Sequence, residues 1–457
     1  MRLERILALL VAVSIGALAQ NSGTKDAPRP DDRFKADLLL VVAHPDDETG
    51  ATGYLAQLLD QGKRVAVVYM THGEAGHNNM GTERGVSLGT VREMELRHAL
   101  TQLGIQNVWF LGGKDTPSQD VLQSLGNWGH GARLEEVVRM IRLTRPAVIL
   151  TWLPGVFIGE NHGDHQAAGV IATEAFDLAG NPAAFPAQLT TPRKVNETLL
   201  EGLQPWQPQK LYFFSDARDD KQFKGKGPEY ATTAISPTRH LPYWRIAMDG
   251  FRFHRTQYRS YIEKLDKMDD QQLAKLATEQ DGWASPLTFI FGKADVPSTL
   301  TGDIFEGVTS TPVSFAPPIP ARPVHHSGLS VRLGGPWGYY DDFRPAHGVT
   351  NLPQAPVPEI GVAVNTTLQI PLILHNDTRE PADIALVVNL PEGWVLKQPI
   401  SRYHLAPSDV FPLQIELTVP TKTNDKPDDI TCQASSAGKD IGTVHLHVRV
   451  QGGGLPQ

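Results

Sequence analysis

The sequence predicts an α/β protein, with a Rossmann-like parallel sheet and flanking helices, followed by a C-terminal immunoglobulin-like β-sandwich. Between residues 37 and 295, short unbroken apolar runs alternate with segments of helical periodicity. This alternation is typical of buried parallel strands joined by crossover helices. From about residue 356 onward, short strand-like segments are separated by Asn, Asp, Pro and Gly, which indicates an all-β domain.

Five apolar segments are expected to form the strands of the sheet, at residues 38–42, 65–70, 108–111, 147–150 and 211–214. Amphipathic segments predict helices at residues 51–61, 90–103, around 134–141 and 245–260. The second helix is expected to begin at Thr90, because Glu93 completes a capping box three residues later. No G-x-G-x-x-G motif follows the first strand, which argues against a dinucleotide site.

Composition divides the rest of the chain into distinct segments. Residues 1–19 combine a basic start, an apolar stretch and an A-L-A cleavage pattern. They predict a signal peptide, and therefore a periplasmic or extracellular protein with no transmembrane span after cleavage. Residues 20–36 are expected to be a flexible leader, 37–295 the α/β domain, 296–355 a proline-rich linker or wrapping arm, and 356–452 the sandwich.

Net charge and cysteine content narrow the possible classes of function. The formal net charge is −8, which argues against nucleic acid as a partner, because phosphate recognition needs a basic surface. Cys432 is the only cysteine, so no intramolecular disulfide can form. Any metal ion must then be held by histidines and carboxylates. The oligomeric state is not readable from the sequence.

The first predicted strand leads directly into the turn A-H-P-D-D-E, which contains His44, Asp46 and Asp47. Charged side chains behind a buried parallel strand lie at its carboxyl end, where open α/β sheets bind ligands. His44 and Asp47 share one tight turn and can reach the same metal ion. Taken alone, such a turn is more often a solvated loop than a metal site.

A second polar cluster, N-H-G-D-H at residues 161–165, follows the strand predicted at residues 147–150. If the two strands are neighbours in a parallel sheet, both clusters emerge at the same edge. Two histidines and one carboxylate with an open position form the ligand set of a hydrolytic zinc site. Asp46 would then be free to act as a general base on a water molecule.

Together, residues 43–48 and 162–165 resemble the signature of the PIG-L/LmbE-like zinc-dependent N-deacetylase family. The resemblance covers about residues 35–292 and leaves out the C-terminal sandwich. Its weaker pieces are residues 71–74, 92–95, 103–104, 110–112, 210–212 and 254–257.

The resemblance implies a role for each residue of the paired motifs. It implies that His44, Asp47 and His165 bind Zn²⁺ and that Asp46 is the general base. It also implies that a cationic His162 stabilises the oxyanion and protonates the leaving amine. In this scheme Asp164 orients and polarises the ring of His162. A His₂Asp ligand set also suits iron or cobalt.

Six further residues are candidates for substrate binding: Glu48, Arg92, Glu95, His77, His254 and Gln257. Several of them also have a structural interpretation. Glu48 could instead support the metal ligands from behind or be a carboxylate at a helix N-terminus. Arg92 with Glu95 could be a surface ion pair, and His254 and Gln257 could pack in the core. His77 lies in a glycine-rich loop that could cover the site.

These observations predict an exported zinc-dependent hydrolase that removes an acetyl or other acyl group from an amino sugar or sugar conjugate. One alternative is a carbohydrate-binding protein without catalytic activity, in which the metal site is structural. Another is a zinc amidase that acts on a different amide of a sugar conjugate. Asp46, His162 and Asp164 favour an enzyme, because a structural zinc site needs no spare base or acid.

Overall fold

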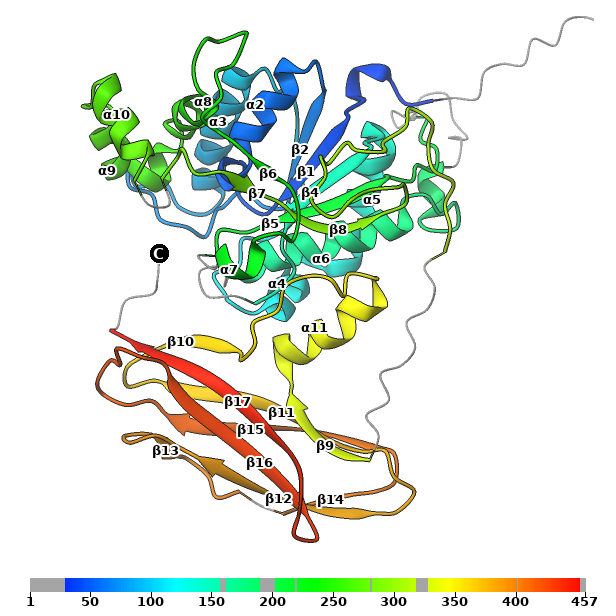
Figure 1. Ribbon diagram of the computed structural model, residues 1–457, viewed down its shortest axis with the longest axis vertical. Coiled ribbons are helices and arrows are strands. Elements are labelled where there is room, and N and C mark those ends of the chain that lie inside the picture. Colours follow the sequence, from blue (N-terminus) through cyan, green and yellow to red (C-terminus); the bar gives the residue numbers. More distant parts are fainter. Residues whose placement is uncertain are drawn as a thin grey trace, which may run out of the picture.

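The computed structural model describes residues 29–156, 162–189, 202–217, 220–279, 282–317, 328–400 and 402–452. Two regions follow one another along the chain, an α/β region and a smaller C-terminal region of two β-sheets (Figure 1). The predicted signal peptide at residues 1–19 lies outside the described residues. In the described part of the chain, no helix is long and apolar enough to cross a membrane.

A six-stranded sheet forms the centre of the α/β region. Its strands, in spatial order, are β3 (Asn107–Phe110), β2 (Val65–Tyr69), β1 (Leu38–Val42), β4 (Val148–Trp152), β5 (Lys210–Phe214) and β8 (Ile290–Ala294). Every residue of β1, β2, β4 and β5 is buried, because helices cover both faces of the sheet. The first five strands are parallel, as predicted, whereas β8 is antiparallel to β5. The sheet is therefore mixed.

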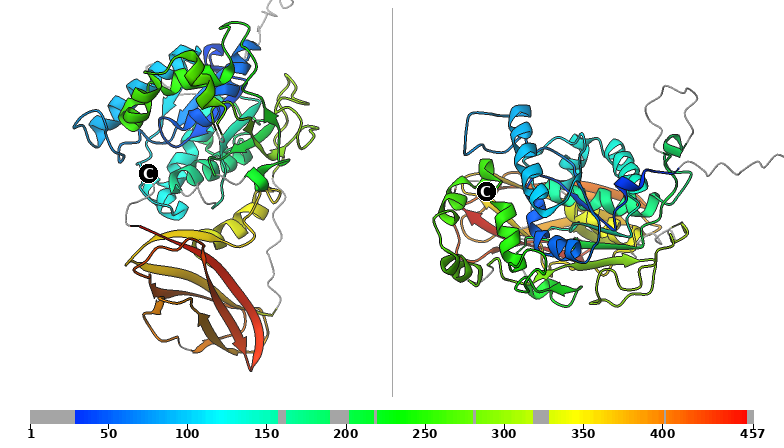
Figure 2. Two further views of the ribbon diagram at one scale, coloured as in Figure 1. Left: turned by 60° about the vertical axis from the view of Figure 1, so that its left-hand side comes forward. Right: turned by 90° about the horizontal axis from the view of Figure 1, so that it is seen from above.

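Helices lie in two layers, one on each face of the sheet (Figures 1 and 2). One layer contains α2 (Thr52–Asp60), α3 (Val86–Leu103) and α8 (Tyr243–Phe251), and the other contains α4 (Val121–Trp128), α5 (His130–Thr144) and α6 (Gly163–Leu178). Beside them lie the short α7 (Asp220–Phe223), the pair α9 (Arg255–Leu265) and α10 (Asp270–Ala277), and the two-stranded sheet of β6 (Glu229–Tyr230) and β7 (Leu287–Thr288).

Three helix predictions differ from the structure. Helix α3 begins at Val86 rather than Thr90, whose hydroxyl donates to the carbonyl of Val86 inside the helix. The single helix predicted at residues 245–260 is two helices, α8 and α9, and His254 is the N-cap residue of α9. Helix α4 was not predicted, because its short apolar face gave too few turns for a periodic pattern.

The end of the predicted flexible leader is ordered against the α/β region. Residues 32–34 form a 3-10 helix, and Ala36 is buried. Arg145 donates to Asp32, and Arg64 donates to the carbonyl of Arg33. These contacts attach the segment from residue 29 onward to the edge of the sheet.

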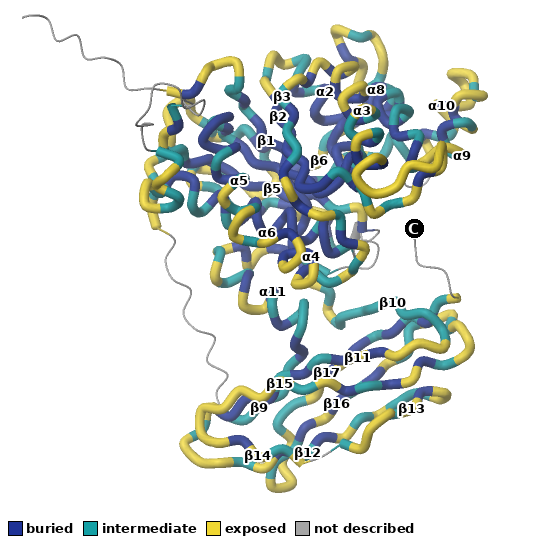
Figure 3. The backbone as a smooth tube through the Cα atoms, turned by 180° about the vertical axis from the view of Figure 1, so that it is seen from behind, coloured by how far each residue is buried: buried dark blue, intermediate teal, exposed yellow. Residues whose placement is uncertain are grey.

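The C-terminal region consists of a five-stranded and a four-stranded sheet. The first has the order β10 (Glu359–Ala363), β17 (Lys439–Gln451), β16 (Asp428–Ser436), β12 (Ala382–Asn389) and β14 (Arg402–Leu405), and the second β13 (Val395–Leu396), β15 (Asp409–Thr418), β11 (Thr367–Asn376) and β9 (Leu329–Leu333). Buried residues of both sheets, such as Leu372 of β11 and Leu446 of β17, belong to one apolar core. The region is thus two sheets packed on a shared core (Figure 3).

The interval between the two regions is more regular than predicted. It contains β9, which pairs with β11, and helix α11 (Gly335–Ala346), where a proline-rich, helix-poor segment was expected. Tyr340 and Phe343 of α11 join the core of the α/β region. Strand β9 and helix α11 therefore attach the C-terminal sheets to the α/β region (Figure 1).

Candidate metal centre and surrounding cleft

The two polar motifs meet where the order of the strands reverses. The chain passes from β1 to β2 on one side, whereas β4 returns to the other side of β1, with Leu38 paired to Val148. Loops after such strands diverge and leave a crevice at the carboxyl edge of the sheet. The loop after β1 carries His44, Asp46 and Asp47, and α6, which follows β4, begins with His162 as its N-cap residue.

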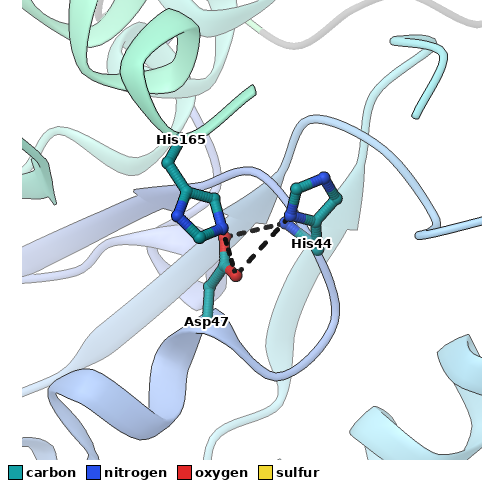
Figure 4. A group of neighbouring side chains, drawn as sticks. All are labelled: His44, Asp47 and His165. Carbon is teal, nitrogen blue, oxygen red and sulfur yellow. Dashed lines mark hydrogen bonds and ion pairs between the residues drawn. The ribbon is translucent and has the colours of Figure 1, made fainter. Parts of the chain in front are cut away.

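His44, Asp47 and His165 form a group that could hold a metal ion, with one ligand atom from each residue within 4.8 Å of the others. Asp47 Oδ1 lies 3.2 Å from His165 Nε2 and 3.7 Å from His44 Nδ1. Figure 4 shows the three side chains converging on one point from the loop after β1 and from α6. This donor set fits a zinc ion with an open coordination position.

Backbone and indole donors hold the carboxylate of Asp47 in place. Its Oδ2 accepts hydrogen bonds from the amides of Ala43 (2.8 Å) and His44 (2.9 Å) and from Nε1 of Trp152 (2.7 Å). Burial opposes ionisation of Asp47, but His165 and His44 outweigh it and lower the pKa well below its usual value. Because Oδ2 is satisfied, Oδ1 is the oxygen presented to a metal ion.

The two histidines are oriented by different neighbours. His44 Nε2 lies 3.2 Å from Asp164 Oδ2 and 3.3 Å from Asp115 Oδ1. A proton on Nε2 shared with these carboxylates leaves the lone pair of Nδ1 for a metal ion. The ring of His165 stacks on Trp152, with 4.1 Å between ring centroids and 3° between planes. The two carboxylates therefore fix the orientation of the His44 ring, and Trp152 fixes that of the His165 ring.

A second possible ligand group shares His44 and adds His162 and Asp164. In that group Asp164 Oδ2 already accepts from the amide of Thr116 (2.9 Å) and lies against His44 Nε2. His162 Nδ1 accepts the backbone N–H of Asp164 (3.2 Å). Since His44 Nε2, Asp164 Oδ2 and His162 Nδ1 already take part in hydrogen bonds, the group with Asp47 and His165 is the better metal site.

Asp46 lies beside the candidate metal ligands in a strained backbone conformation. Its φ is 118°, a value that costs a residue with a side chain roughly 1–3 kcal/mol. Asp46 Oδ2 accepts from the amide of Gln257 and from the hydroxyl of Tyr258 (2.9 Å). Burial and the neighbouring Asp47 raise the pKa of Asp46 to about 7. Such a carboxyl can exchange a proton near neutral pH.

The predicted pairing of Asp164 with the ring of His162 is not present. The carboxylate of Asp164 is fully buried and contacts His44 and Thr116. Burial, together with His44 and His165, lowers the pKa of His162 to about 3, so the expected cationic ring is neutral here. With Nδ1 accepting from the Asp164 amide, the proton lies on Nε2, which becomes a hydrogen-bond donor.

Two of the predicted substrate-binding residues lie beneath the site rather than on its surface. Glu48 is 2% exposed and His254 is 0% exposed. Glu48 Oε1 bonds His254 Nε2 (2.7 Å), and Oε2 accepts from the hydroxyl of Tyr69 (2.9 Å) and the amide of Asp46 (3.1 Å). Glu48 and His254 therefore support the turn that carries Asp46, where a contact with substrate was predicted.

Arg92, Glu95 and His77 have separate positions. Arg92 lines the cleft and donates to the carbonyls of Gly73 (2.6 Å) and His77 (3.0 Å). A Cβ atom on Gly76 would lie 2.5 Å from Arg92 Nη2, so a side chain there would displace the Arg92 guanidinium from its present position. Glu95 was predicted to bind substrate, with an ion pair to Arg92 as the alternative, and its described contacts are neither of these. Its carboxylate instead accepts from the amide and hydroxyl of Thr256, and the side chain of His77 is exposed outside the cleft lining.

Gln257 does line the cleft, and the structure adds three residues that the sequence analysis did not single out. Asp115 follows β3 and contacts His44, Trp152 ends β4 and contacts Asp47, and Tyr258 contacts Asp46. Asp115 and Trp152 could have been found as polar or aromatic residues at the carboxyl ends of strands. Tyr258 was missed because the sequence analysis placed it inside a single helix across residues 245–260, without a link to Asp46.

The fold and site define an α/β protein with a candidate metal centre at the reversal point of its sheet. Residues 39–176 match the family described as PIG-L: GlcNAc-PI de-N-acetylase. A 1D-myo-inositol 2-acetamido-2-deoxy-alpha-D-glucopyranoside deacetylase of Rhodococcus erythropolis is 35% identical over 233 residues, which cover 47% of this chain and 69% of the relative. The Thermobifida fusca protein of the same name is 29% identical over 255 residues, or 48% and 82% of the two chains. The chain belongs to the PIG-L family.

A solved structure, the N,N'-diacetylchitobiose deacetylase of Pyrococcus horikoshii, matches with 19% identity and a TM-score of 0.39. The match covers 63% of this chain and 92% of that chain. At these values it adds nothing to the family assignment, which rests on the sequence matches above.

Proposed function

We propose that this protein is a zinc-dependent N-deacetylase that hydrolyses the acetamido group of an amino sugar or sugar conjugate. One observation carries the proposal: His44, Asp47 and His165 converge on one point, with Asp46 beside them. The relatives named as deacetylases of an acetamido sugar support the same reaction.

Each residue of the site has a task in amide hydrolysis. A zinc ion held by His44, Asp47 and His165 would polarise the amide carbonyl and acidify water. Asp46 accepts the proton of the attacking water, and the hydrogen bonds from Gln257 and Tyr258 aim its carboxylate. His162, with its proton on Nε2, donates a hydrogen bond to the carbonyl oxygen as negative charge develops there.

The leaving amine must take up a proton before the C–N bond breaks. Asp46 holds the proton removed from water and can return it to the amine nitrogen, so that acetate and a free amino sugar leave. The carboxylate of Asp164 keeps His44 oriented through its Nε2 contact, whereas Asp164 contacts the ring of His162 through its backbone N–H. In the proposed mechanism, Asp164 is therefore a positioning residue.

An acetate-release assay tests this function. The full chain, purified after loading with zinc, is incubated with N-acetylglucosamine, its oligomers and an N-acetylglucosaminyl inositol conjugate, with and without a chelator. We expect release of acetate that the chelator abolishes and added zinc restores. Metal binding without acetate release from any substrate would instead favour the carbohydrate-binding alternative.

We also propose that the protein is exported and that its C-terminal region is immunoglobulin-like. The first proposal rests on the signal-peptide pattern of residues 1–19. The second is supported by two antiparallel-rich sheets on one shared core. Cell fractionation of a producing host, with N-terminal sequencing of the purified chain, tests export. A chain that stays in the cytoplasm and still carries residues 1–19 would refute it.

A further inference from the structure

The cleft at the candidate metal centre is larger than one amino sugar requires. Its volume is about 1330 Å³, whereas pockets for small ligands are roughly 300–1,000 Å³. Its walls come from both regions of the protein: the candidate ligands of the α/β region line it, and so do residues of β10 and β17. In Figures 1 and 3, α9, α10 and β10 project toward the same side of the molecule.

The wall from the C-terminal region is a polar strand face built over small residues. Strands β10 and β17 pair with Gly361 opposite Arg449 and Ala363 opposite Gln451. The alternate residues Val448 and Val450 are buried in the core of the C-terminal region. Because successive side chains of a strand point to opposite faces, Arg449 and Gln451 point away from that core and toward the cleft.

Aromatic side chains form part of the facing wall. Phe251, Tyr258, Tyr261 and Trp283 line the cleft. Phe251 lies 4.8 Å from Tyr258 and 5.2 Å from Trp283 between ring centroids. Trp283 Nε1 donates to the hydroxyl of Tyr261 (3.0 Å). Tyr and Trp rings present an apolar face together with a hydrogen-bonding group at the edge. A pyranose ring likewise has an apolar C–H face and hydroxyl groups at its edge, so the two are complementary.

The charges along the cleft disfavour an anionic substrate. A zinc ion at the candidate metal centre would offset the carboxylates of Asp46, Asp47 and Asp115. Farther along, Asp216 and Glu279 also line the cleft, and its two cations are Arg92 and Arg449. Arg92 donates to backbone carbonyls, and Arg449 is paired with Glu359 at 3.0 Å. A phosphate or uronate in the cleft would therefore face carboxylates, with both cations already engaged.

We propose that the substrate is a neutral N-acetylated oligosaccharide, whose acetamido sugar occupies the candidate metal centre and whose further sugar units lie between the aromatic wall and the β10–β17 face. This inference rests on the proposed function and names its substrate class. It makes the C-terminal region part of the substrate-binding cleft, with Gln451 as a specificity-determining residue.

Two substitutions on the β10–β17 face test the inference in the full chain. Gln451→Ala removes a polar side chain from the wall, and Gly361→Val adds bulk to it. A Cβ atom on Gly361 would meet Gln451 Nε2 at 3.3 Å, a flexible side-chain end that can move. His447→Ala is the matched control, because His447 shares the face of β17 with Arg449 but lies outside the cleft lining.

The measurement is kcat/KM for acetate release from the mono-, di-, tri- and tetrasaccharide of N-acetylglucosamine. We expect kcat/KM to rise about tenfold or more from the monosaccharide to the tetrasaccharide, the equivalent of one or two good contacts. In Gln451→Ala and Gly361→Val this ratio falls severalfold, whereas His447→Ala keeps the wild-type ratio. Thermal unfolding of each variant checks that the fold is intact.

Other results would overturn the inference. One such result is a ratio of kcat/KM between tetrasaccharide and monosaccharide that is near one in the wild type or unaltered in both variants. Another is a preference for an anionic lipid-linked amino sugar. Either result would leave deacetylation itself established. If no sugar releases acetate, calorimetric binding of the same series separates the two proposals. Affinity that rises with oligosaccharide length and is weakened by both variants would support oligosaccharide binding in the cleft but not deacetylation. Affinity that does not depend on oligosaccharide length would refute oligosaccharide binding there.

Discussion

The two regions of this protein treat buried polar groups differently. In the α/β region, ionisable side chains including His44, Asp47, Glu48, Asp164 and His254 are buried at the carboxyl edge of the sheet. Among the described residues of the C-terminal region, the buried polar side chains are His375 and Asn376. Burying a charge is costly unless it is paired or binds a ligand. The buried charge therefore marks the α/β region as the place where chemistry is expected. The core of the C-terminal region serves packing, and the role proposed for that region lies on the face of β10 and β17 that lines the cleft.

The largest effect is expected at the centre of the α/β region. Replacing Asp46 by Asn should lower kcat for acetate release by about 10²–10⁴-fold, the usual contribution of a positioned general base. Asn tolerates positive φ better than most residues, so folding and metal content should persist. Kinetics and metal analysis check this, with Asp383→Asn on the exposed surface of β12 as the control. Wild-type kcat in Asp46→Asn would remove Asp46 from the mechanism.

Cys432 reports on the C-terminal region alone. Burial raises the pKa of its thiol to about 11, so at pH 8 the folded protein holds the thiol in its neutral, unreactive form. Labelling by a thiol reagent should be slower than in the unfolded chain by about 100-fold or more, because the thiolate is the nucleophile. Raising the pH from 7 to 9 should speed labelling of both states, because each thiolate fraction rises, while the folded protein stays slower than the unfolded chain at every pH.

The same thiol separates the unfolding of the two cores. Tryptophan fluorescence and Cys432 labelling, followed together against denaturant, should give two transitions, because the regions have separate apolar cores. A single shared transition would show that α11 and β9 couple the regions into one cooperative unit.

A smaller effect is expected from the indole that supports Asp47. Trp152→Phe keeps an aromatic ring against His165 but removes the Nε1 hydrogen bond to Asp47. Zinc affinity, measured by competition with a chelator, should fall about 10–100-fold, as for other partners of metal ligands. Trp394→Phe is the matched control, since its Nε1 donates to Asp428 in the C-terminal region. Equal losses in both variants would mean that the effect is one of stability.

The smallest effect is expected where the regions join. Tyr340 of α11 donates to Gln166, the residue after His165, at 2.8 Å. Tyr340→Phe should lower the free energy of unfolding of the α/β region by about 1–2 kcal/mol, because it leaves a buried acceptor unpaired. Tyr339→Phe is the control, because the ring of Tyr339 stacks on Phe343 and its hydroxyl forms no hydrogen bond with any described residue. Denaturant titration should distinguish them, and no loss in Tyr340→Phe would make this link dispensable.

Local sequence patterns correctly predicted the strands that are buried on both faces. Strands β1, β2, β4 and β5 are buried on both faces and read as continuous apolar runs, so their positions were predicted to within about two residues. Strand β8 was missed because it contains Gly292 and Lys293 and lies at the edge of the sheet. Strand β9 and helix α11 were missed because their partners are remote in sequence.

By itself, the sequence determined the α/β class, the two polar motifs and their place behind buried strands, because strand burial and motif spacing are properties of short segments. Only the tertiary structure decided what each side chain touches. It placed Asp164 on His44 rather than on His162, Glu48 and His254 beneath the site, and Gln257 and Tyr258 on Asp46. These contacts join residues more than 100 positions apart, and their geometry depends on how strands and helices pack, which no local pattern encodes.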